Sequence, residues 1–142
     1  MSSPGSSVPE RQVSNLEEGG SNPSRGSTFL GCWHYVVLRQ ELSGGAALAQ
    51  AVHAAGESAA LLGRALPGDT RAVILSATKA EMDALATDLT LEAPSSPRVD
   101  ALRIITETDG PLAGSQTALA FVTHQREAVR PLVAHLKVWR GK

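Results

Sequence analysis

The stretch RAVILSATKAE, residues 71–81, decides the fold class. Its first seven residues form an apolar run in which polar and apolar side chains do not alternate, a pattern typical of a strand covered on both faces. Thr78 and Glu81 follow with the spacing of a capping box, in which each side chain satisfies a backbone N–H at the start of a helix. A doubly covered strand that leads directly into a helix predicts an α/β fold.

Segments of the same two kinds lie on either side of this stretch. The β-branched and apolar runs at residues 33–38, 101–108 and 117–123 are predicted strands. Residues 43–45, Ser-Gly-Gly, break the first strand and supply the cap of an alanine-rich helix that ends near Gly63. The first two strands are therefore separated by a helix, which favours a parallel pair.

The second half of the chain continues the alternation. The helix that starts at the capping box gives way to a loop at residues 93–98. Residues 126–138 have helical apolar spacing, but Pro131 requires either that this helix starts near Arg130 or that it kinks. The order β-α-β-α-β-β-α predicts a compact four-stranded mixed sheet with helices on both faces.

The alanine-rich helix carries a polar stripe. In ALAQAVHAAGES, residues 47–58, the side chains of Gln50, His53 and Glu57 fall on one side of a helix. The opposite stripe is expected to be buried, and the polar stripe is expected to face either water or a substrate. The residues of that opposite stripe are Leu48, Val52, Ala55, Ala59 and Leu62.

Composition limits the class of protein. The 142 residues suffice for one domain, predicted at residues 29–142, and the Ser/Gly/Pro-rich residues 1–28 are predicted to be a disordered tail. We expect no membrane span and no secretory signal, because no run of 18 apolar residues and no basic leader are present. Cys32 is the only cysteine, which excludes an internal disulfide and is simplest to explain by a cytoplasmic location.

Charge does not mark the whole chain as a nucleic-acid binder, since the formal net charge is −1. Residues 117–142 are nevertheless basic, with five Lys or Arg and one Glu. Within them Trp139 stands among Lys137, Arg140 and Lys142, where it serves either to stack a base beside phosphate-binding cations or to anchor the last helix to the core.

Two further features carry candidate chemistry. Glu57 stands one helical turn from His53 and can favour its protonated form, although such a pair also occurs on plain solvated faces. The loop GPLAGSQT, residues 110–117, can offer backbone N–H groups of Gly114 and Ser115 to an oxyanion or phosphate, or be a simple turn before a strand. The four histidines are dispersed, so we expect no metal site.

Taken together, the motifs resemble one family. YVVLRQEL, AQAVHAA, GSQTALAF and HLKVW are similar, in this order, to motifs of the type 2 peptidyl-tRNA hydrolases, of which the chain resembles a divergent bacterial member. The resemblance implies a small α/β domain with a four-stranded mixed sheet. It also implies hydrolysis of the ester that joins a peptide to the 3′ end of tRNA, without a metal or a bound cofactor. The loop before the first helix, residues 43–45, lacks the lysine that the family carries there.

From this resemblance we expect His53 or Asp109 to act as general base and Thr117, with the Gly114-Ser115 backbone, to stabilise the oxyanion. The expected substrate-binding residues are Arg39, Gln50, Gly114, Ser115, Lys137 and Arg140. Peptidyl-tRNA is the expected partner, and a homodimer is left open. Two alternatives also stay open: a non-catalytic binding or regulatory module of the same fold, and a small-molecule hydrolase. The latter suits residues 29–142, which hold 11 basic and 11 acidic side chains.

Overall fold

The computed structural model describes residues 31–92 and 98–141. The tail predicted at residues 1–28 and nearly all of the loop predicted at residues 93–98 lie outside this part of the chain. The elements are, in order, β1 (Trp33–Arg39), α3 (Gly44–Leu61), β2 (Arg71–Ala77), α4 (Lys79–Glu92), β3 (Asp100–Thr106), β4 (Gln116–Thr123), α5 (Arg126–Val133) and β5 (Lys137–Val138).

The strands form one mixed sheet in the order β3-β4-β1-β2-β5. β1 and β2 are parallel and are connected through α3, whereas β4 runs antiparallel to both β1 and β3. The α/β class and the mixed sheet are thus confirmed, but the predicted number of four strands is one too few. The additional strand is β5, which pairs antiparallel with the outer edge of β2.

β5 lies where the sequence predicts the end of a helix. The helix predicted over residues 126–138 starts at Arg126 but ends at Val133, with Pro131 inside it. Pro131 has no N–H for the helix ladder, so the last turn is weakened. The chain then turns, and Lys137 and Val138 pair with β2, whose edge would otherwise have no hydrogen-bonding partner.

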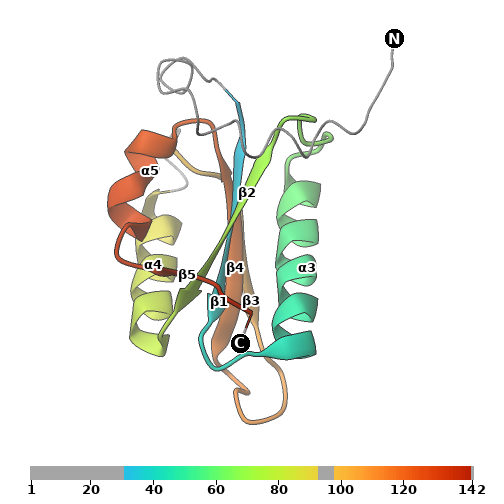
Figure 1. Cartoon of the computed structure of the whole chain (residues 1–142), viewed down its shortest axis with the longest axis vertical. Helices are drawn as coiled ribbons and strands as arrows, with labels where there is room; N and C mark the ends of the chain where they lie inside the picture. Colours follow the sequence, from blue (N-terminus) through green and yellow to red (C-terminus); the bar gives the residue numbers. More distant parts are fainter. Residues whose placement is uncertain (1–30, 93–97, 142) are drawn as a thin grey trace. The chain divides into compact units, whose positions relative to one another are not determined.

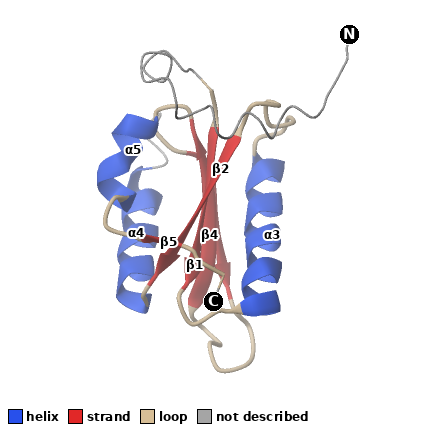
Figure 2. Ribbon diagram, in the orientation of Figure 1, coloured by secondary structure: helices blue, strands red, loops and turns tan. Residues whose placement is uncertain are grey.

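Helices cover both faces of the sheet, as predicted. Figure 1 shows α3 on one face and α4 with α5 on the other, and Figure 2 shows the strands as the central layer. The capping box is present at the start of α4: Thr78 Oγ1 accepts from the Glu81 N–H at 3.1 Å, and Glu81 Oε1 accepts from the Thr78 N–H at 2.9 Å. On this face the rings of Tyr35 and Phe121 stack with centroids 5.1 Å apart.

The buried side of α3 differs from the predicted one. Its fully buried residues are Ala47, Ala54 and Ser58, whereas Leu48 and Val52, which were expected to be buried, are 56% and 73% exposed. The sheet beneath is lined by alanines as well as by larger residues, and small side chains on both layers let the helix lie close to the strands. The predicted apolar stripe was wrong for Leu48 and Val52, which lie away from the side on which the helix packs, whereas Ala55 of the same stripe packs against the buried cluster.

A buried polar chain links α3 to the sheet at the amino-terminal end of β1. The Ser58 hydroxyl donates to the Ala101 carbonyl at 2.7 Å, and His34 Nε2 lies 3.1 Å from Ser58 Oγ. Since the single Ser58 hydroxyl proton is used, His34 Nε2 is the donor in that contact. Ala101 has a φ of 54° and lies at a register shift between β3 and β4, which turns its carbonyl toward α3.

Candidate functional site

One end of the sheet collects several of the residues singled out from the sequence. Arg39 closes β1, α3 begins five residues later at Gly44, and β4 begins at Gln116. Because β1 and β4 are antiparallel, with Leu38 opposite Ala118, the end of one strand lies beside the start of the other. Figure 1 shows these segments together at the lower end of the molecule. This is the carboxyl end of the parallel pair, where α/β sheets commonly bind ligands.

Thr117 occupies a β-bulge at the start of β4. Ile105 pairs with Ala118 and Thr106 pairs with Gln116, so Thr117 is the additional residue on its strand. A bulge re-aims the side chain that it carries, and here the Thr117 hydroxyl lies 3.4 Å from Gln50 Oε1 on α3. Gln50 and Thr117, which are 67 positions apart in the chain, are therefore brought together.

Thr117 itself has no exposed surface. Its hydroxyl contacts the Gln50 side chain rather than solvent. The expectation that Thr117 stabilises an oxyanion directly stays a prediction, and it requires Gln50 to move. The contact instead holds Gln50 Oε1 toward the sheet and leaves the Gln50 amide N–H groups as donors.

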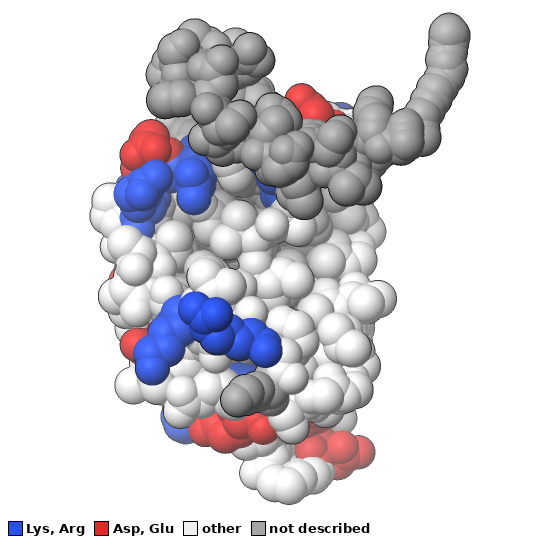
Figure 3. Space-filling model, in the orientation of Figure 1, with Lys and Arg blue, Asp and Glu red and all other residues white. Residues whose placement is uncertain are grey.

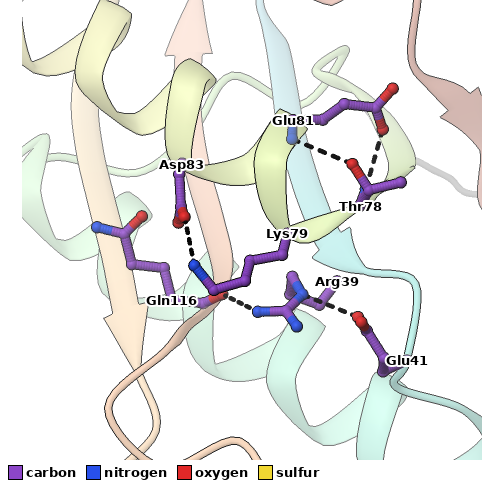
Figure 4. Close-up of polar contacts among 7 residues, drawn as sticks. All are labelled: Arg39, Glu41, Thr78, Lys79, Glu81, Asp83 and Gln116. Carbon is purple, nitrogen blue, oxygen red and sulfur yellow. Dashed lines mark hydrogen bonds and ion pairs between the residues drawn. The ribbon is translucent and has the colours of Figure 1, made fainter.

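Arg39 is the most deeply buried cation of the site, with 4% of its side chain exposed. Its Nε donates to Glu41 Oε1 at 2.8 Å, and its Nη1 donates to the Gln116 carbonyl at 3.4 Å, as Figure 4 shows. The hydrogen bond from Arg39 is the main reason that the pKa of Glu41 is lowered. Arg39 is thus fixed between β1 and β4, and the Glu41 carboxylate balances its permanent positive charge.

His53 and Glu57 are paired, as the sequence predicts. His53 Nε2 contacts Glu57 Oε2, and the other carboxylate oxygen, Oε1, accepts from Arg103 Nε on β3. The Arg103 hydrogen bond is the first cause of the lowered Glu57 pKa, and the contact with His53 contributes less. The His53 side chain is 54% exposed, so its ring is accessible for chemistry on the flank of α3 that also carries Gln50.

The loop before β4 does not supply the expected backbone donors. The Gly114 N–H donates to the Glu107 carbonyl at 2.9 Å, and the Ser115 N–H donates to the Leu112 carbonyl at 2.9 Å. Gly114 also has a φ of 82°, which lets the loop turn back on itself. The prediction that these two N–H groups face an oxyanion was wrong, because the turn uses both. Asp109 is exposed in the same loop.

The carboxy-terminal cations lie on the opposite edge of the sheet. Lys137 is in β5 and Arg140 follows it, both exposed, and two strands, β1 and β2, separate β5 from β4. Figure 3 shows a band of Lys and Arg side chains across β5 and the residues after it. Trp139 between them is partly buried against the α3 face of the sheet and donates its backbone N–H to the Ile74 carbonyl at 3.0 Å. The core-anchor role therefore describes Trp139 better than base stacking.

Two residues that hold other side chains of the site in place could not be found from the sequence. Glu41 and Arg103 were not singled out, yet they hold Arg39 and Glu57. The spacing of Glu41 to Arg39 is compatible with a turn at the strand end, which is a weak signal. Arg103 is 46 positions from Glu57, and its contact depends on α3 lying over β3.

Comparison with protein-family models gives no match, and no curated protein matches the chain. Among residues 31–92 and 98–141, no cluster of three or more His, Cys, Asp or Glu side chains is arranged to hold a metal ion. Within the same residues no helix combines the length and the hydrophobicity needed to cross a membrane.

Proposed function

We propose that the chain hydrolyses the ester bond of peptidyl-tRNA, which releases the peptide and recycles the tRNA. The observation that carries the proposal is the contact between Gln50 and Thr117, made through a bulge at the start of β4. These two residues belong to the motifs that resemble the type 2 peptidyl-tRNA hydrolases. Arg39 from the first of those motifs lies at the same end of the sheet.

The ester chemistry is assigned to the flank of α3 that faces β4 and β3. His53 takes a proton from water as the water oxygen attacks the ester carbonyl. The amide N–H groups of Gln50, which Thr117 orients, donate to the oxygen that becomes negative. Collapse of the intermediate then breaks the ester bond and releases the 3′ oxygen of the tRNA, which receives the proton that His53 took from water. Asp109 is the second candidate for the base, since it is exposed in the neighbouring loop.

The amino terminus of α3 suits an anionic part of the substrate, because the N–H groups of a first helical turn favour negative charge. Arg39 lies at the same end of the sheet but on its α4 side, near Asp83 and paired with Glu41 (Figure 4). Ser43, the N-cap residue of α3, makes no side-chain cap hydrogen bond that would occupy these N–H groups. Lys137 and Arg140 are proposed to contact phosphates further along the tRNA.

Release of labelled peptide from purified peptidyl-tRNA by the full chain tests this proposal. We expect turnover with and without added divalent metal. We also expect that Gln50→Glu, which replaces the amide donor by a carboxylate of the same shape, lowers turnover by roughly 10²-fold, the scale of a lost oxyanion donor. Gln40→Glu, an equal charge change on an exposed residue after β1, is the control. Full activity of the Gln50 variant would remove Gln50 from the mechanism.

A non-catalytic module of the same fold is the second candidate. It is favoured by the occupied N–H groups of Gly114 and Ser115 and by the absence of a lysine in residues 43–45. The same experiment separates the two: a folded chain that binds peptidyl-tRNA without releasing peptide at any pH would support the module and overturn the hydrolase.

A further inference from the structure

Glu57 binds two positively charged or protonatable partners at once, one through each carboxylate oxygen. His53 Nε2 meets Oε2 from the same helix, and Arg103 Nε donates to Oε1 from β3. The three side chains come from two elements that pack against each other. The carboxylate is therefore shared, and the charge that it presents to His53 depends on whether Arg103 is in place.

We propose that Arg103 is a positioning residue that acts through Glu57 to set how readily His53 takes up a proton. A carboxylate that acts with its full charge on a neighbouring histidine favours the imidazolium, and an imidazolium has no free lone pair with which to accept a proton from water. Arg103 binds one oxygen of this carboxylate from β3 and offsets part of its charge, so Glu57 favours the imidazolium less strongly. The role in turnover rests on the function proposed above, whereas the effect on His53 does not.

Few other charged groups compete for His53 among the residues described. His34, on the α3 face of β1, is bonded to Ser58, more than one turn further along the helix. Asp100, at the start of β3, accepts from the Ala101 N–H. The other side chains that β1 and β4 present toward α3 are neutral; they include Val36, Leu38, Thr117, Ala118 and Ala120.

We call the action of Arg103 on His53 through Glu57 the relay. NMR titration of the His53 ring in the full chain tests it. Arg103→Gln should raise the pKa of His53, because Glu57 then acts on it with its full charge, and Glu57→Gln should lower it. For half-exposed pairs we expect each shift to be about 0.2–0.7 pH unit. In the Glu57→Gln background, Arg103→Gln should have almost no effect, since the carboxylate that connects the two residues is gone.

The double variant distinguishes a relay from direct repulsion between Arg103 and His53. An equal shift from Arg103→Gln with and without Glu57 would overturn the relay, and so would no shift at all. Arg130→Gln is the matched control: it also breaks an exposed Arg–Glu pair, but on α5, which covers the other face of the sheet. Arg130→Gln should leave the NMR titration curve of His53 unchanged.

Turnover then connects the relay to catalysis. With peptidyl-tRNA as substrate, the acidic limb of the pH profile of kcat/KM should move upward in Arg103→Gln by the same amount as the His53 titration. A limb that stays in place while the His53 titration moves would overturn the positioning role. Absence of turnover in the unaltered chain would instead contradict the proposed function, and the NMR titration would still decide whether the relay exists.

Discussion

The two exposed flanks of α3 differ in what they contact. The flank toward β4 and β3 carries Gln50, His53 and Glu57, and each of them has a polar partner. The other flank carries Leu48 and Val52, which are more than half exposed and belong to neither buried core cluster. Between the two flanks lies a narrow buried line of small residues that faces the sheet.

This difference shows that hydrophobicity alone does not select the buried side of a helix. Ala47 and Ala54 are buried because their size allows α3 to approach the alanines of β4. Larger side chains at the same positions would hold the helix away from the strands. The polar flank is then placed beside the bulge at Thr117, so packing of the small residues determines which polar groups meet.

The largest effect is expected on turnover, between two neighbouring residues of α3. His53→Ala should lower the release of peptide from peptidyl-tRNA by roughly 10²-fold or more, the scale of a lost general base. Val52→Ala, on the other flank, should change it less than twofold. Circular dichroism of both variants checks that the helix is retained. If both variants keep full activity, the polar flank is only a solvated helix face.

A smaller effect is expected on stability, between the buried line and the outer surface of α3. Ala54→Leu adds a large side chain where no surface is exposed and should lower the free energy of unfolding by about 1–3 kcal/mol. Ala49→Leu makes the same change at an exposed position and should alter it by less than about 0.5 kcal/mol. Urea unfolding followed by tryptophan fluorescence measures both. Equal losses would mean that α3 packs through a different face.

The smallest effect is expected on the pH dependence of stability, and it comes from His34, which contacts Ser58 of α3. Burial lowers the pKa of His34, so the unfolded chain, with an ordinary value near 6.5, binds more protons than the folded chain just below that pH. The free energy of unfolding should therefore fall as pH drops from about 6.5 to 5, by at most about 1.4 kcal/mol per pH unit.

The control for this pH dependence is His34→Gln, which removes the titrating ring. The unfolding free energy of this variant should depend less on pH between pH 5 and 6.5. Glu41 and Glu57, whose pKa values are lowered, lose their contribution only below about pH 4.5, outside this window. A slope that persists unchanged in the variant would assign the pH dependence to another group.

Much of the fold could be predicted from local patterns. The run at residues 71–77 and the capping box after it are both present as predicted, because each depends on neighbours within a few residues. The end of the last helix could not be predicted in the same way. Lys137 and Val138 form a strand because β2 has an open edge, and this edge exists only once the sheet has assembled.

The site could be predicted only in part. The spacing of His53 and Glu57 predicts their pairing, since four residues make one helical turn. The Gln50–Thr117 contact depends on a bulge, and the Arg103–Glu57 contact depends on how α3 crosses β3, neither of which leaves a local pattern. The free N–H groups expected at Gly114 and Ser115 were wrong because turn formation competes for the same donors.

The short strand β5 also limits aggregation through the outer edge of β2. β2 is seven residues long and rich in aliphatic side chains, and β5 pairs with it through only two residues, Lys137 and Val138. Without this cover, β2 would present a row of unpaired amides to any extended segment in solution, which is a known route to aggregation. Removing β5, or fusing a bulky tag directly after it, should therefore promote aggregation before it unfolds the domain.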